Sequence, residues 1–202
     1  MRGKKQIAMN WLKRAVVWLS RLRHCGGFGI QSPWAYQMAR NVINEHWPYY
    51  AYEDLADAAN GSDKDAIRLC RLYFRLANFL QPSVVVDFCP ESDDYARYMK
   101  RGCMKSDIRK ITSNDDLQAL SHIDLMRMSL TGDYKDVFFA SLRKVTASSV
   151  IILQDIYSNQ STKAFWRDVL ADERCRTTFD LYYCGLVFFD PKRYKENYII
   201  NF

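Results

Sequence analysis

Two aspartates stand where parallel strands are expected to end, and they are the residues best placed for chemistry. Asp87 lies in the apolar, β-branched run SVVVDF, and Asp155 follows the run VIILQ. In a sheet with helices on both faces, ligands bind at the carboxyl ends of the strands. Each carboxylate is therefore a candidate ligand contact. The same positions also suit an acid that caps the next helix or forms an Asx turn, and both alternatives stay open.

The remaining residue types that carry chemistry give weaker signals. His122 begins a predicted strand, at the end opposite the ligand crevice, whereas His24 lies in the glycine-rich segment HCGGFG, which could fold over the crevice as a lid. The six cysteines form no C-x-x-C pair, and no histidine neighbours them at zinc-ligand spacing, so we expect free thiols in a reducing, cytoplasmic compartment. The sequence contains no P-loop, nucleophile elbow or zinc signature.

The elements that must position Asp87 and Asp155 follow an alternating pattern. Apolar runs alternate with amphipathic stretches from residue 83 onward, and this order predicts an α/β fold, a doubly wound, mostly parallel sheet. The last strand-like pieces, TTFDLYY, LVFF and NYIINF, have no helix between them, so the C-terminal edge is expected to be antiparallel. The predicted strands are 83–88, 107–112, 122–128, Tyr134–Ala140 and 150–153; the predicted helices are 64–80, 92–101, 115–120 and 162–171.

The N-terminal part of the chain is basic. Residues 1–44 hold 8 of the 29 Lys and Arg residues and no acid, whereas the rest of the chain holds 21 basic and 23 acidic residues. We therefore divide the chain into a basic N-terminal helical extension, residues 1–62, and an α/β domain, residues 63–202. In this division Ser32 caps a helix that Pro33 begins.

Residues 6–23 read as an amphipathic helix with Trp11 and Trp18 on its apolar stripe. Leaving both indole rings in water is unfavourable, so we expect the stripe to be buried against the domain or a second subunit, with Lys13, Arg14 and Arg21 facing outward. Self-association or a protein partner is the first interpretation of this helix. Peripheral contact with an anionic membrane is a second one, and nucleic acid is not expected as a partner.

Four stretches, in this order, resemble a known family: HCGGFGIQSPWAY (24–36), YYAYEDL (49–55), RLYFRLANFLQPSVVVDF (71–88) and residues 151–190. Together they resemble a bacterial family of class I S-adenosylmethionine-dependent methyltransferase-like proteins, related to small-molecule O-methyltransferases. The resemblance implies a Rossmann-like methyltransferase fold and a cofactor crevice after the first strand. It places Asp87, Cys89, Glu91 and Asp155 beside S-adenosylmethionine.

The sequence departs from that family at the crevice itself. A glycine-rich turn should follow the first strand, but this chain has Cys89-Pro90-Glu91 and no glycine between Gly61 and Gly102. The acids Glu91, Asp93 and Asp94 are expected to repel the carboxylate of the cofactor. The second strand ends in Lys110-Ile111-Thr112-Ser113-Asn114, without the acid that should hold the ribose.

The carboxylates of a metal site are missing as well. Ala140 and Gln154 occupy the positions where metal-using relatives carry acids, so no Mg²⁺ or Ca²⁺ is expected. The sequence therefore predicts a degenerate methyltransferase-like protein that binds S-adenosylmethionine weakly or not at all. The alternatives are an active methyltransferase acting on a small acceptor, with no catalytic residue assigned, and a non-enzymatic module that docks through its basic helix.

Overall fold

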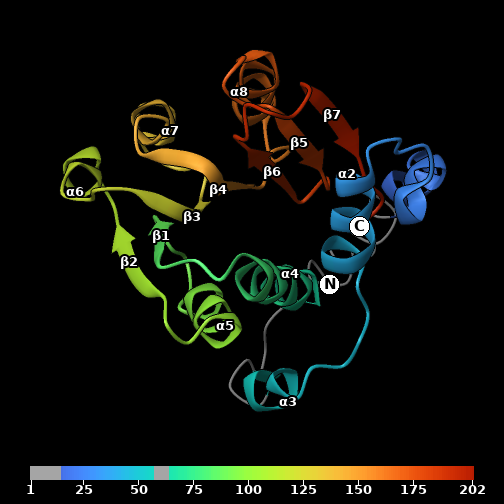
Figure 1. Ribbon diagram of the computed structural model, residues 1–202, viewed down its shortest axis with the longest axis horizontal. Helices are drawn as coiled ribbons and strands as arrows, with labels where there is room; N and C mark the ends of the chain where they lie inside the picture. Colours follow the sequence, from blue (N-terminus) through green and yellow to red (C-terminus); the bar gives the residue numbers. More distant parts are fainter. Residues whose placement is uncertain (1–14, 57–63) are drawn as a thin grey trace, which may run out of the picture.

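The computed structural model describes residues 15–56 and 64–202, and its centre is a seven-stranded sheet (Figure 1). The strands lie in the order β2-β1-β3-β4-β6-β5-β7, and β6 alone runs antiparallel to both of its neighbours. This arrangement confirms the predicted α/β class and its antiparallel C-terminal edge, although β7 pairs with β5 in parallel. The strands are β1 (Val84–Phe88), β2 (Asp107–Ile111), β3 (Ile123–Met128), β4 (Val145–Gln154), β5 (Thr177–Asp180), β6 (Cys184–Phe188) and β7 (Glu196–Ile199).

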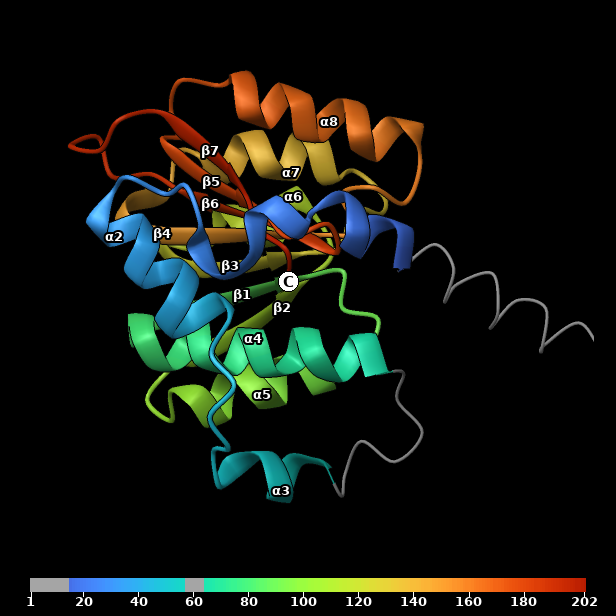
Figure 2. The same cartoon turned by 90° about the vertical axis from the view of Figure 1, so that its right-hand side faces the viewer.

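Helices cover both faces of the sheet, as Figures 1 and 2 show. Residues of α2, α3, α4 and α5 share one hydrophobic core, and residues of α6, α7 and α8 share the other. The helices are α2 (Pro33–Met38), α3 (Ala51–Ala56), α4 (Lys64–Leu80), α5 (Asp94–Gly102), α6 (Asn114–Gln118), α7 (Tyr134–Ser141) and α8 (Gln160–Ala171). A π-helix, Ala39–Ile43, continues α2 directly. None of the helices described here has the length and apolarity needed to cross a membrane.

The two cores arise from the alternation of side chains along each strand. Val85 of β1 and Leu125 of β3 point into the core beneath α4 and α5, whereas their neighbours Val86 and Met126 point into the core beneath α6–α8. Successive strand residues face opposite sides of a sheet, so strands covered on both faces must be apolar at every position. A polar or charged residue inside such a strand therefore requires a hydrogen-bond or ion-pair partner.

Capping residues and prolines in the sequence predicted several helix boundaries correctly. Helix α4 has the predicted bounds, and α2 begins at Pro33 with the Ser32 hydroxyl accepting the Ala35 N–H at 3.4 Å. In α8 the cap is Asn159, which forms a capping box with Thr162. The predicted helix that began at Thr162 therefore starts two residues earlier, at Gln160.

The predicted strand Tyr134–Ala140 is wrong, because these residues form α7. A short apolar run does not distinguish a strand from a buried helix. Here Val137, Phe138 and Ser141 are buried together, which matches one face of a helix, and Phe138 packs edge-on against Phe165 of α8. The sheet therefore has one strand fewer than predicted, and β4 is the strand that follows β3 directly.

The N-terminal segment differs from its prediction in two ways. Residues 15–20 are helical and a 3₁₀ helix, Leu22–Gly27, follows. Trp18 is 53% exposed, so it is not buried against the domain, and Arg21 faces inward with a side chain only 12% exposed. Trp11, Lys13, Arg14 and the predicted boundary at residues 62 and 63 involve positions outside the described residues.

Candidate ligand crevice at the carboxyl ends of the strands

The strand order predicts a ligand site between the carboxyl ends of β1 and β3. The chain leaves β1 through α5 to β2 on one side, then returns through α6 to β3 on the other side of β1. In open α/β sheets, ligands bind at such a switch point, outside the carboxyl ends of the strands. Asp87 of β1 and Arg127 of β3 are register partners at this point.

Arg127 lies at this switch point, and its side chain is fully buried. Its Nη1 donates to Asp87 Oδ1 at 2.9 Å, and its Nη2 donates to Glu91 Oε2 at 2.7 Å. Its Nε and Nη2 both donate to Gln154 Oε1, at 3.0 and 2.8 Å. Three elements, β1, β3 and β4, are thus joined through one side chain.

Two tyrosines, one on α4 and one on α5, complete this hydrogen-bond network. Tyr73 of α4 donates its hydroxyl to Gln154 Oε1 at 3.2 Å, and Gln154 Nε2 donates to the Tyr95 hydroxyl of α5 at 3.2 Å. The Arg127 guanidinium also lies 4.2 Å from the centre of the Tyr95 ring, within the range of a cation–π contact. We call Asp87, Arg127, Gln154, Tyr73 and Tyr95, with Glu91, the Arg127 network.

Burial and ion pairing shift the pKa values of the charged residues in this network. Burial raises the pKa of Asp87, and the Arg127 guanidinium opposes that shift without cancelling it. Burial alone would lower the pKa of Arg127, but Tyr73 and Asp87 raise it, so Arg127 stays charged. Asp87 Oδ2 is buried and has no hydrogen-bond partner. The second oxygen of this carboxylate therefore carries a desolvation penalty that no hydrogen bond among the described residues offsets.

The turns that leave β1 and β4 use strained backbone instead of glycine. Cys89 has φ of 48° and Asp155 has φ of 58°, both in the left-handed region that side chains disfavour. The Cys89 N–H donates to the Ile111 carbonyl at 2.9 Å, and the Asp155 N–H donates to the Tyr183 carbonyl at 2.7 Å. These two amides are consequently engaged within the protein rather than directed at a ligand.

The acids after β1 do not form the repelling cluster that the sequence suggested. Glu91 also accepts a hydrogen bond from the Ser129 hydroxyl, besides that of Arg127. Asp93 is paired with Lys110 at 2.5 Å, and Asp94 is paired with Arg97. Each of the three carboxylates has a cationic partner, so the predicted repulsion is largely neutralised.

The four residues assigned to the crevice from the sequence lie at or just after the carboxyl ends of β1 and β4, and their contact with a cofactor stays a prediction. Asp87 and Glu91 share Arg127, and Cys89 stands between them, half-buried, on the same turn. Asp155 is at the end of β4, with its Oδ2 3.5 Å from Gln154 Nε2. Sequence reasoning missed Arg127, although a lone arginine inside the apolar strand HIDLMRM was a signal for a buried partner.

The predicted metal positions need one correction. Ala140 lies on α7, so the residue that follows β3 at the crevice is Ser129, and Gln154 is held by the Arg127 network. Within residues 15–56 and 64–202, no group of three or more His, Cys, Asp or Glu residues could hold a metal ion. That Mg²⁺ does not bind at the strand ends stays a prediction.

The glycine-rich segment with His24 packs against the C-terminal residues. The His24 carbonyl accepts the Asn201 N–H at 3.0 Å, and Arg21 Nη2 lies 2.8 Å from Asp180 Oδ1 at the end of β5. Asp180 also accepts from the Tyr157 hydroxyl and from the indole N–H of Trp166. No contact joins His24 to the Arg127 network among the described interactions, so a lid role for His24 gains no support.

Comparisons with known proteins identify the fold. No family model matches the sequence, and no curated protein matches it. Among solved structures, the chain is similar to a methyltransferase from Geobacter sulfurreducens, with 13% identity, a TM-score of 0.51 and coverage of 72% of this chain and 91% of that one. It is also similar to the SAH-bound methyltransferase PaMTH1 from Podospora anserina, with 10% identity, a TM-score of 0.54 and coverage of 84% and 98%.

These likenesses define a class of fold. The chain has the α/β fold of the class I methyltransferases, whose solved members are its structural neighbours. At such low identity, the similarity concerns the fold, and function has to be argued from the crevice.

Proposed function

We propose that this protein keeps the methyltransferase fold but that its own side chains occupy the cofactor crevice. It therefore binds S-adenosylmethionine weakly or not at all. The observation that carries this proposal is the Arg127 network. A buried cation bonds the strand-end carboxylate Asp87 and the acid Glu91, two acids that a cationic ligand at this site could otherwise use.

The chemistry of the cofactor fits this crevice poorly. S-adenosylmethionine carries an ammonium and a sulfonium, but Asp87 and Glu91, the carboxylates that could attract them, are already paired with Arg127. Its carboxylate would need free amide donors, but the Cys89 N–H is bonded to Ile111 and Pro90 has no N–H. The first two residues of this turn therefore offer no free amide donor to the amino-acid end of the cofactor.

The end of β2, where the ribose of the cofactor would lie, also fits the cofactor poorly. Asp116, an acid close to the end of β2, accepts from the Thr112 and Ser113 amides at 3.1 Å and from the Ser113 hydroxyl at 3.0 Å. This capping box satisfies the Asp116 carboxylate within its own helix. The neighbouring Asp115 is exposed, so no acid is held ready for a pair of ribose hydroxyls.

A thermal-shift titration tests the proposal. A ligand present at one hundred times its Kd stabilises a protein by about 2.7 kcal/mol, which raises the melting temperature of a chain of this size by roughly 5–10 °C. We expect S-adenosylhomocysteine and S-adenosylmethionine at about 1 mM to shift the melting temperature by less than about 1 °C. A shift of several degrees with either ligand would contradict the proposal.

A second candidate function, an active methyltransferase, rests on two unsatisfied atoms. Asp87 Oδ2 and Asn114 Oδ1 are both buried acceptors without partners, at the carboxyl ends of β1 and β2. An ammonium and a ribose hydroxyl would satisfy them. If this candidate is correct, Asn114→Ala should reduce the thermal shift, whereas Asp115→Asn, at the exposed neighbour, should leave it unchanged.

A further inference from the structure

Large apolar side chains are exposed mainly in one part of the chain. Of the 13 large hydrophobic residues that are exposed among the described residues, 8 fall between residues 16 and 50. Trp47 is 75% exposed and Phe28 is 81% exposed. Large apolar side chains that are exposed in one part of a folded protein are candidates for a binding surface.

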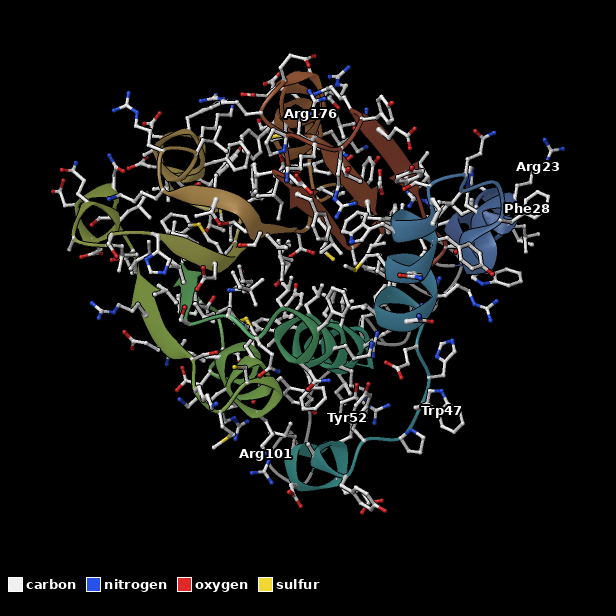
Figure 3. All side chains as sticks on the ribbon, in the orientation of Figure 1. Arg23, Phe28, Trp47, Tyr52, Arg101 and Arg176 are labelled. Carbon is white, nitrogen blue, oxygen red and sulfur yellow. The ribbon has the colours of Figure 1, made fainter. Side chains whose placement is uncertain are left out.

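Some of these residues lie on one side of the molecule (Figure 3). Figure 3 shows Arg23, Phe28 and Trp47 along the same side of the molecule, directed away from the ribbon, and Figure 2 looks onto that side. Trp18 and Trp47 line a common cleft of about 990 Å³, together with Arg40 and Arg68. We call this surface the N-terminal face, defined by Trp18, Leu19, Arg23, Phe28, Arg40 and Trp47.

The N-terminal face is also the basic part of the molecule. Arg23 and Arg40 are exposed, and the first acid in the sequence, Glu45, lines the same cleft and accepts the Tyr49 hydroxyl at 2.7 Å. The sequence before residue 15 adds five more Lys or Arg residues and no acid. The remaining chain carries a slight excess of acids, so the excess positive charge of the sequence falls within residues 1–44, and the N-terminal face contributes Arg23 and Arg40 to it.

The N-terminal face is anchored to the sheet rather than free. Arg21 points inward and bonds Asp180, and Asn201 Nδ2 donates to the Trp18 carbonyl at 3.3 Å. The Arg21 guanidinium also lies 5.5 Å from the centre of the Tyr182 ring. With the backbone tied down in this way, the exposed indole and phenyl rings are presented on a fixed surface.

We propose that the N-terminal face binds the surface of a phospholipid bilayer that contains anionic lipids. Tryptophan and phenylalanine partition to the boundary between headgroups and acyl chains, while Arg and Lys attract the anionic headgroups. Each basic residue near such a surface contributes about 1 kcal/mol, or roughly five-fold in affinity. Leu19 and its aliphatic neighbours favour a bilayer over nucleic acid, because a phosphodiester backbone offers them no apolar contact.

Vesicle co-sedimentation of the full chain tests this proposal. We expect binding to vesicles with about 30% phosphatidylglycerol, much weaker binding to pure phosphatidylcholine, and a loss of binding as salt rises above roughly 0.1 M. The intrinsic tryptophan fluorescence should shift to the blue with the anionic vesicles alone, since Trp18 and Trp47 would leave water. Equal binding to both vesicle types, or none, would overturn the proposal.

Paired variants locate the binding surface. Trp18→Ser with Trp47→Ser, and separately Arg23→Glu with Arg40→Glu, should each lower the partition coefficient by at least about ten-fold. The matched control is Met104→Ser with Lys105→Glu, an exposed apolar–basic pair in the loop between α5 and β2, on the other side of the molecule in Figure 1. This control should stay within about two-fold of the natural chain.

Light scattering separates a lipid surface from a second copy of the chain. The proposal expects the solution mass to be the same for the natural chain and for the Trp18→Ser/Trp47→Ser variant. A dimer that this variant dissociates, together with vesicle binding that it leaves intact, would assign the face to self-association and refute the lipid proposal.

Discussion

Replacing Arg127 by methionine should destabilise the protein strongly, because it leaves Asp87 buried without its counter-charge. The side chains of Arg127 and Asp87 are both 0% exposed, whereas that of Glu91 is 50% exposed. Removing one partner of a buried ion pair costs about 3–5 kcal/mol. Water can rehydrate Glu91, so nearly all of the loss comes from Asp87 and from the bonds to Gln154. Methionine is similar in length, so a cavity contributes little.

Urea unfolding at pH 7, followed by circular dichroism, measures this loss. We expect Arg127→Met to lower the free energy of unfolding by about 3–5 kcal/mol. The matched control is Arg97→Met, which removes an arginine paired with Asp94 on the surface of α5, where the side chains are 42% and 22% exposed. This exposed pair should cost at most about 1 kcal/mol.

A double variant tests whether the loss is electrostatic. Replacing a buried ion pair by apolar residues of similar size is often neutral or stabilising. Arg127→Met with Asp87→Leu should therefore be at least about 2 kcal/mol more stable than Arg127→Met alone. If the second substitution lowers stability further, Asp87 is not the source of the penalty and the reasoning fails.

The same loss should depend on pH. A carboxyl whose pKa is higher in the folded protein binds more protons when folded, so stability falls as pH rises through the interval above the unfolded pKa. Burial already places Asp87 in this class, and removing Arg127 raises its folded pKa further. The loss caused by Arg127→Met should thus be largest at pH 7 and smaller near pH 4. A loss below about 1 kcal/mol at pH 7, or one that is equal at both pH values, would refute the assignment.

Three further substitutions test other parts of the structure. Gly185→Ala should cost about 1–3 kcal/mol in thermal or urea unfolding, because the added Cβ would stand 2.6 Å from the Trp166 ring; an unchanged stability would contradict this packing. Arg21→Ala should speed hydrogen exchange in the N-terminal segment without altering exchange in β1, since it removes the bond to Asp180; uniform exchange would show that the segment is not anchored there. Partial burial raises the pKa of Asp124, but hydrogen bonds from two backbone amides and a hydroxyl at the start of β1 lower it by more. The Asp124 carboxylate therefore stabilises the fold above its unfolded pKa, and this stabilisation is lost as pH falls. Asp124→Ala should therefore cost about 1–3 kcal/mol at neutral pH and flatten the acid limb of the stability curve, and an unchanged acid limb would contradict it.

Much of the fold was predictable because local and periodic signals agreed. The amphipathic pattern of residues 64–80 and the stop at Pro82 define α4, and the β-branched run before Asp87 defines β1. The prediction for Tyr134–Ala140 failed because its short apolar run, residues 137–140, suits either element, and the contact of this segment with α8 decides.

The sequence predicted where the candidate site lies but not which of its side chains interact. Strand ends locate Asp87 and Asp155 in any doubly wound sheet. The pairing of Arg127 with Asp87 depends on the strand order and register, which bring together residues 40 positions apart. The inward turn of Arg21 likewise depends on Asp180, 159 residues away, and no helical periodicity carries that information.

The measurement that bears most directly on the central claim is a calorimetric titration of the natural chain with S-adenosylhomocysteine at neutral pH. If Arg127 and its partners occupy the crevice, the titration should show no binding heat with a Kd below about 1 mM, which corresponds to roughly −4 kcal/mol. A one-to-one isotherm with a Kd near 1 µM, about −8 kcal/mol, would contradict the account and identify the crevice as a working cofactor site.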